Sequence, residues 1–161
     1  MQHLFNAESE EQKPGRALTA DEVVLAQSVF GDGIDYSQVR VLQEKYVFFQ
    51  PDNITMAPDG NIYFHPDSKA YSSNFGRAGL GLQGHFIHEM THVWQHQNGI
   101  NVVFNGIFQR NYNYSLTPRK SFTSYGIEQQ GNIVRDYFFL QRDSGGGPAI
   151  ERYRNTIPFA R

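Results

Sequence analysis

Residues 84–96 read Gly84-His85-Phe86-Ile87-His88-Glu89-Met90-Thr91-His92-Val93-Trp94-Gln95-His96, and this stretch decides how the chain is organised. It contains His88-Glu89-x-x-His92, the HExxH signature of zinc hydrolases. Residues four apart lie on one face of an α-helix, so His88 and His92 can offer two imidazole nitrogens to one metal ion. Glu89 follows the first ligand and can reach a water bound to that metal. The stretch therefore predicts a helix that carries two metal ligands and a general base.

The other positions of this helix are apolar, which lets it bury one side and offer the other to a metal. These apolar residues are Phe86, Ile87, Met90, Val93 and Trp94. The alternative is a buried helix whose histidines are satisfied by hydrogen bonds alone. That arrangement is costly, because two buried imidazoles beside a carboxylate need a partner.

The composition indicates a single globular domain with an aromatic-rich core. The chain has 161 residues, 39% of them hydrophobic, with 13 Phe and 9 Tyr. Its net charge of −2 without a basic run argues against nucleic-acid binding. The absence of Cys excludes disulfides, thiolate zinc sites and cysteine nucleophiles, so a bound zinc would need His, Asp, Glu or water.

No apolar run is long enough to span a membrane. The first residues, Met1–Asn6, lack the basic start and apolar core of a classical signal peptide. We therefore expect a protein that is cytoplasmic, or exported without a classical signal peptide.

Local patterns predict an α+β fold. Residues 1–17 are polar and predict a flexible N-terminal arm, with a single domain over 18–161. Thr19 and Glu22 form a capping box before a short helix that ends at Gly31. Val, Tyr and Phe are frequent over 36–50 and predict a strand, and Pro58-Asp59-Gly60 predicts a hairpin between 54–57 and 61–64.

The rest of the pattern places the motif between a loop and a second helix. Residues 67–83 are polar and glycine-rich, and predict a loop that leads into the metal helix. That helix is expected over 81–97, a second helix over 127–141, and a last helical turn or docked tail over 149–161. The strand at 61–65 is a candidate edge for pairing with an extended peptide.

A catalytic zinc usually takes three protein ligands and a water, so the two histidines leave the site incomplete. The extended motif places a third His six residues after the second, but that position is Asn98. The other common solution is a Glu from a later helix, and only Glu128 and Glu151 follow the motif. Glu128 begins the second predicted helix and shares a polar face with Asn132 and Asp136. We predict Glu128 as the third ligand.

The rivals for this role are His96, Asp136 and Glu151. His85 and His96 extend the histidine face, but one ion cannot easily contact residues eight apart on a straight helix. Both are expected beside the ligands rather than on the metal. Asp136 is expected either to orient a ligand or to pair with a neighbouring Arg.

Hydrolysis also needs a donor for the oxyanion that forms on the substrate. The sequence offers several candidates without selecting one: Tyr112, Tyr114, Tyr125, Tyr137, His65 and Arg135. Core packing is the alternative for each Tyr.

Motifs in chain order resemble a known family. They comprise Leu18–Glu22, Val29–Gly31, Asp35–Val41, Asn61–Phe64 and His88–Gln95, with Glu128–Gln130 a weaker match. Together they resemble the zincin-like domain in the core genes of bacterial contractile injection systems, and small Vgr-related and Rhs-associated proteins. Met90 and Trp94 stand where that family often has aliphatic residues. The resemblance implies a zincin-like fold: a small mixed sheet, an HExxH helix and a second helix with the third ligand.

The first interpretation is a zinc metallopeptidase of the Glu-zincin type, with Glu89 as general base and His88, His92 and Glu128 on Zn²⁺. Its partners would be a peptide or protein substrate, with no nucleic acid and no membrane, and the resemblance implies an effector or accessory of a secretion system. The alternative is a non-enzymatic zincin-like adaptor or cargo-binding module. A third interpretation is a zinc amidase acting on cell-wall peptide.

Overall fold

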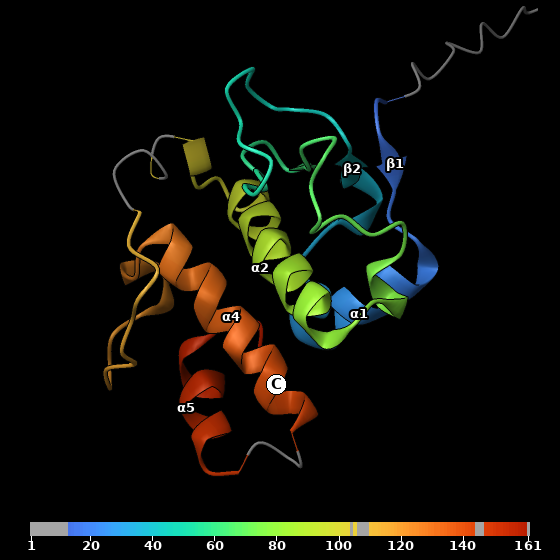
Figure 1. Cartoon of the computed structure of the whole chain (residues 1–161). Helices are drawn as coiled ribbons and strands as arrows, with labels where there is room; N and C mark the ends of the chain where they lie inside the picture. The colour runs from blue at the N-terminus through green and yellow to red at the C-terminus, as the bar shows by residue number, and fades with distance from the viewer. Residues whose placement is uncertain (1–12, 104, 106–109, 144–146, 161) are drawn as a thin grey trace, which may run out of the picture.

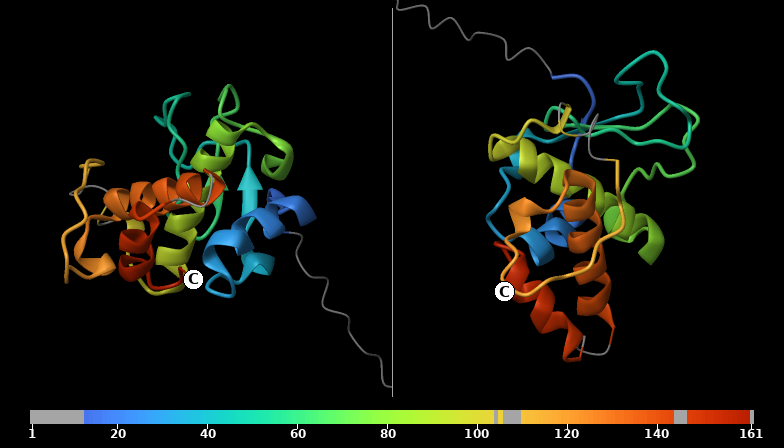
Figure 2. Two further views of the ribbon diagram at one scale, coloured as in Figure 1. Left: turned by 90° about the horizontal axis from the view of Figure 1, so that it is seen from below. Right: turned by 90° about the vertical axis from the view of Figure 1, so that its left-hand side faces the viewer.

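The central element of the computed structural model is helix α2, Leu80–Gln97, which carries the HExxH motif. Residues 13–103, 105, 110–143 and 147–160 are described. Helices α4 (Ile127–Arg142) and α5 (Ala149–Thr156) lie on one side of α2, and α1 (Ala20–Phe30) lies with the strands on the other (Figure 1). The left view in Figure 2 shows the same separation. The predicted α+β class is confirmed.

The sheet is small and mixed, as expected. Strands β1 (Arg16–Ala17), β2 (Arg40–Leu42) and β3 (Ile62–Tyr63) lie in the order β1-β2-β3. The pair β1–β2 is antiparallel and the pair β2–β3 is parallel, with Val41 opposite both Arg16 and Ile62. Of the predicted N-terminal arm, residues 1–12 lie outside the described residues. Arg16 and Ala17 belong to β1, so the folded part begins before the predicted boundary at residue 18.

Two strand predictions were wrong in their extent. Within 36–50, Tyr36–Gln38 forms a 3₁₀ turn (η1) and only Arg40–Leu42 is strand. Phe48 and Phe49 are 87% and 67% exposed. They do not pack against the core, so their preference for strands is not enough to form one here. The predicted hairpin is reduced to one bridge, in which Met56 and Tyr63 exchange backbone hydrogen bonds of 3.0 and 2.7 Å. Strand β3 lies at the edge of the sheet, and on the side away from β2 the Met56 bridge takes up the backbone N–H and carbonyl of Tyr63.

The capping box at the start of α1 is confirmed, and it is also part of a buried ionic network. Glu22 is fully buried, and its carboxylate accepts hydrogen bonds from the Arg16 guanidinium at 2.9 Å and from the backbone N–H of Thr19 and Phe75. Phe75 belongs to a 3₁₀ turn (η2, Phe75–Arg77) within the predicted loop before α2. One carboxylate therefore joins β1, α1 and the segment that leads into the metal helix.

The core between the sheet and α2 is aromatic, as the composition predicts. The rings of Phe64, Phe75 and Phe86 form a continuous stack, with centroid separations of 5.5 and 5.0 Å. All three side chains are fully buried. This stack fixes α2 against the small sheet, because an aromatic side chain buries a large apolar area.

The principal packing of the metal helix is against α4. A Cβ atom on Gly84 would lie 2.3 Å from Phe139 Cζ, so only glycine allows this close approach. Contacts pair Gly84 with Phe139 and His92 with Glu128, which means that the two helices run antiparallel. Both predicted helices, 81–97 and 127–141, are confirmed to within a residue, and α5 provides the expected terminal helix. None of the helices among the described residues could cross a membrane.

Candidate metal centre

The three predicted ligands converge in the space between α2 and α4. Their ligand atoms all lie within 4.8 Å of one another. Nε2 of His92 is 2.8 Å from Oε1 of Glu128, and Nε2 of His88 is 3.4 Å from the other carboxylate oxygen. Both histidines are buried, and the Glu128 side chain is 15% exposed. One helix thus supplies two imidazoles on one face, and the neighbouring helix supplies a carboxylate opposite them.

The Asn132 side chain sets the tautomer of His88. Its amide nitrogen donates to the carbonyl of Tyr112 at 3.1 Å, so its Oδ1 must face Nδ1 of His88, 2.9 Å away. An oxygen at that point can only accept, so the proton of His88 lies on Nδ1. In the neutral ring, Nε2 then carries the lone pair that a metal at this position would use. Hydrogen bonds of this kind orient metal-binding imidazoles.

Gln95 sets which ring nitrogen of His92 carries a proton in the same way. Its amide nitrogen donates to the carbonyl of Ile127 at 3.1 Å and to Oε1 of Gln130 at 2.9 Å. Its oxygen consequently accepts from Nδ1 of His92 at 2.8 Å. Gln130 is oriented in turn by a 2.8 Å hydrogen bond to the carbonyl of Tyr125. Both glutamines are buried, and this chain of amides directs Nε2 of His92 towards Glu128 and the metal position.

The electrostatics of the cluster match its donor set. Burial raises the pKa of Glu128, but hydrogen bonds from His88 and His92 outweigh burial and hold that pKa well below its usual range. Burial lowers the pKa of His92, yet its hydrogen bond and charge interaction with Glu128 raise that pKa to about 9. A divalent cation among the three ligand atoms would replace the proton that His92 shares with Glu128.

Glu89, the predicted base, is buried beside the cluster. Among the described residues, its Oε2 has no hydrogen-bond partner, and its Oε1 is 3.9 Å from Nε2 of His85. A buried carboxylate oxygen without a donor is costly, which is consistent with a site for a bound water. Burial lowers the pKa of His85, whose Nε2 is 2.8 Å from the hydroxyl oxygen of Thr55. His85 thus contacts Glu89 and not the metal ligands, as expected.

The close approach of α4 to His88 depends on Gly131. A Cβ atom at this position would lie 2.6 Å from Cε1 and 2.8 Å from Nδ1 of the His88 ring. Any larger residue would displace the imidazole or separate the helices. Gly131 lies between Asn132, which bonds to His88, and Gln130, which bonds to Gln95, so three consecutive residues of α4 shape the site.

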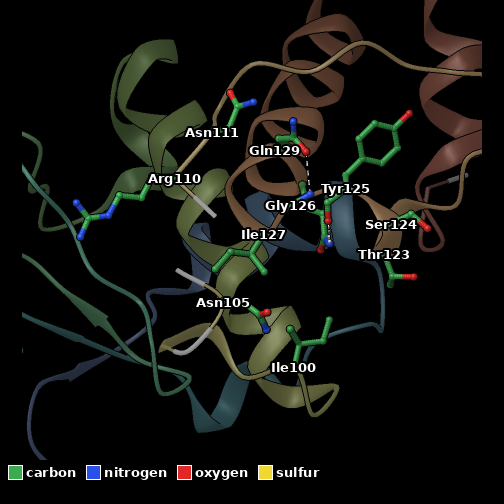
Figure 3. A pocket seen from close by; sticks show the side chains of 11 residues that line it. Ile100, Asn105, Arg110, Asn111, Thr123, Ser124, Tyr125, Gly126, Ile127 and Gln129 are labelled. Atoms are coloured by element: carbon green, nitrogen blue, oxygen red, sulfur yellow. Dashed lines mark hydrogen bonds between the residues drawn. The ribbon is translucent and has the colours of Figure 1, made fainter. Parts of the chain in front are cut away.

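The start of α4 is held by its own turn. The backbone N–H of Gly126 donates to Oε1 of Gln129 at 2.8 Å (Figure 3). A hollow of about 490 Å³ lies beside this turn and is lined by Arg110, Tyr125 and Gly126, among others. Neither ligand histidine lines it. The turn places Glu128 in the first turn of α4, where the positive end of the helix dipole favours a carboxylate.

The rivals for the third ligand lie elsewhere. His96 is exposed and lies against Gly60. Glu151 is exposed on α5 and pairs with Arg154 at 2.5 Å. Asp136 accepts from the Tyr114 hydroxyl and pairs with Arg135, which is the surface pairing considered above and not a contact with a ligand histidine.

The structure also distinguishes among the candidate oxyanion donors. Tyr125 and Tyr137 are buried, and Nδ1 of His65 accepts from the backbone N–H of Asp67. The Tyr112 ring, by contrast, stacks on His88, with ring centroids 6.3 Å apart. The residues at the site that sequence reasoning missed include Gln95 and Gly131, while Asn132 was noted only for sharing a face with Glu128. Their one signal was position, within one turn of a predicted ligand.

Comparisons with known proteins identify relatives of this chain. No family model matches the chain. The type VI secretion system spike protein VgrG2b of Pseudomonas aeruginosa is 45% identical over 151 residues, which cover 89% of this chain but only 15% of that protein. The solved effector domain of Pseudomonas aeruginosa VgrG2b is 46% identical, with a TM-score of 0.82 over 88% of this chain and 83% of the domain. The resemblance to Vgr-related proteins is confirmed.

Proposed function

Because this chain belongs to the family of the VgrG2b effector domain, we propose that it is a secretion-system effector that hydrolyses peptide bonds with the help of zinc. The observation that carries the proposal is the pairing of a three-ligand cluster with a buried carboxylate whose Oε2 has no partner among the described residues. A structural zinc site is closed by four protein ligands, whereas a catalytic site keeps one position open and places a base beside it.

The donor set fits zinc. Two imidazole nitrogens and one carboxylate oxygen form one of the common catalytic combinations, and the orienting amides of Gln95 and Asn132 complete it. His88, His92 and Glu128 would hold the ion. When bound, zinc would lower the pKa of a water and polarise the carbonyl of the substrate.

Glu89 would act as the general base. Its carboxylate would take a proton from the attacking water and pass it to the nitrogen of the leaving amine. Its burial and its unpartnered oxygen support this role, because a water held there would complete its hydrogen bonds. The zincin-like description of the fold rests on the same elements: a mixed sheet, the HExxH helix and a second helix with the third ligand.

Delivery by a secretion system follows from the relative. The relative is named as a spike protein of a type VI system, and the part that matches this chain is named as its effector domain. We therefore infer association with a secretion-system component. The substrate would be a peptide or protein.

Zinc content and peptide cleavage test the proposal together. Purified protein should contain one zinc per chain and cleave a proteome-derived peptide mixture, with new termini detected by mass spectrometry. Glu89→Gln should keep its zinc and lose cleavage, since it removes only the base. His92→Ala should lose both.

His96→Ala is the matched control, because this exposed histidine lies on the same helix but away from the cluster. It should retain both zinc and cleavage. Full cleavage by Glu89→Gln would refute the hydrolytic role. Zinc bound by wild type without any cleavage would instead support the adaptor interpretation.

A further inference from the structure

An extended segment, residues 112–116, lies along α4 next to the metal ligands. The Gln129 side chain donates to the carbonyl of Asn113 at 2.7 Å, and the Asn132 side chain donates to the carbonyl of Tyr112. Asp136 accepts from the hydroxyl of Tyr114. Positions 129, 132 and 136 are spaced by three and four, so one face of α4 holds this segment. The hydrogen bonds hold its backbone in place beside His88.

This attachment places the Tyr112 ring over the metal site. The ring is nearly parallel to that of His88, with an interplanar angle of 26°. Tyr112 is also 49% exposed, and it lines an open groove of about 610 Å³ together with Asn132 and Arg135. None of the three predicted ligands lines this groove, which adjoins them through Tyr112 and through Asn132, the partner of His88.

The hydroxyl of Tyr112 lies among the charges of the site. It interacts with the carboxylates of Glu128 and Glu89. A phenol has an ordinary pKa of about 10, so it keeps its proton at neutral pH and remains a hydrogen-bond donor. Its neighbours are the carboxylate proposed to bind the metal and the carboxylate proposed to activate water. A substrate carbonyl has to lie between these two groups to react.

The other candidate donors are occupied or distant. The Tyr125 hydroxyl accepts from the backbone N–H of Thr117 and donates to the carbonyl of Ser115. The Tyr114 hydroxyl is taken by Asp136 and Tyr153. The Arg135 guanidinium pairs with Asp136 at 3.1 Å. Of the candidates drawn from the sequence, Tyr112 alone combines exposure to the groove with contact to a ligand histidine.

We propose that Tyr112 is a catalytic residue, whose hydroxyl exchanges Glu128 for the substrate and donates a hydrogen bond to the carbonyl oxygen of the scissile peptide as negative charge develops there. The proton stays on the phenol throughout. This role rests on the proposed hydrolysis and assigns its missing donor. Loss of one such donor typically costs about 10²–10³-fold in kcat.

The test is Tyr112→Phe, which keeps the ring on His88 and removes only the hydroxyl. We expect kcat to fall by about 10²-fold with little change in KM, because the donor acts on the transition state. Zinc affinity should stay within about threefold of wild type, a limit well below the ~10–100-fold loss typical of residues that orient ligands. Tyr46→Phe is the control, since Tyr46 is a partly exposed tyrosine that packs on Tyr63.

A second measurement separates this role from the proposed function itself. An N-phosphoryl leucine amide carries tetrahedral oxygens and can be titrated against zinc-loaded protein by calorimetry. Its affinity should fall by about 10²-fold in Tyr112→Phe and stay unchanged in Tyr46→Phe. If Tyr112→Phe cleaves peptides and binds the phosphoryl compound as well as wild type does, Tyr112 is not the donor, but the proposed peptidase function stands. A large loss of zinc would also overturn the assignment, by making Tyr112 a positioning residue for Glu128. Absence of cleavage and of binding in wild type would refute the proposed function.

Discussion

The amide oxygen of Gln95 lies 2.8 Å from Nδ1 of His92, while the amide nitrogen of the same side chain donates to the carbonyl of Ile127 at 3.1 Å. Ile127 directly precedes Glu128 in the first turn of α4. One buried side chain therefore orients the second ligand and binds the backbone beside the third. The site is assembled by a contact between two helices and not by the HExxH helix alone.

Replacing Gln95 with Leu should weaken zinc binding by ~10–100-fold, the usual effect of losing a partner that orients a ligand. The imidazole of His92 would lose its acceptor, and the carbonyl of Ile127 would lose a donor. Competition with a chromophoric chelator measures the affinity. Gln97→Leu is the control, because Gln97 is exposed at the end of the same helix and bonds to the loop at Asp35. Equal affinities in the two variants would contradict the orienting role.

Gly131→Ala should disturb the site through sterics alone. The new methyl would lie within 3 Å of three atoms of the His88 ring, so the ring or the helix must move. We expect zinc affinity to fall at least tenfold and the urea midpoint to fall, consistent with overpacking costs of ~1–3 kcal/mol. Gly81→Ala provides the comparison, since nothing lies within 4 Å of its Cβ position on α2. Zinc binding that is unchanged in Gly131→Ala would argue against the close helix contact.

The pH dependence of the metal-free protein should follow the His92–Glu128 pair. The pKa of His92 is raised from 6.5 to about 9, so the stability from this pair is fully present below pH 6.5 and is lost as pH rises through about 9. Urea unfolding of chelator-treated protein should therefore show stability that falls between about pH 6.5 and pH 9. Glu128→Gln removes the charge that raises the pKa of His92, so its free energy of unfolding should change little with pH over this range.

Zinc binding at pH 7.5 should also release a proton, detectable by calorimetry in buffers of different ionisation enthalpy.

The network around Glu22 should control global stability without contributing to the metal site. Removing this buried carboxylate by Glu22→Ala leaves two backbone N–H groups without their acceptor and removes the ionic partner of the Arg16 guanidinium. We expect the free energy of unfolding to fall by about 3–5 kcal/mol, the cost of breaking a buried ion pair. Glu151→Ala, at an exposed pair on α5, should have little effect on urea unfolding. Similar midpoints for the two variants would mean that the Glu22 network does not stabilise the fold.

Much of the candidate site could be predicted from sequence because helical periodicity is local. The spacing of His88 and His92 places them on one face whatever surrounds the helix, and the scarcity of carboxylates after the motif left Glu128 as the leading third ligand. The capping box of α1 and the bounds of α2 and α4 follow from the same short-range rules. The strands were harder to predict, because a two- or three-residue strand depends on its partner and not on its own pattern.

The sequence was thus enough to predict two candidate ligands, a candidate base and the helix that carries them. The tertiary structure alone decided how these groups are held: which ring nitrogen of each histidine faces the metal position, and which tyrosine of several lies over it. The physical reason is distance along the chain. The amides that set the tautomers bridge α2 and α4, 32 and 44 residues apart for Gln95–Ile127 and His88–Asn132, and no local pattern encodes such a contact.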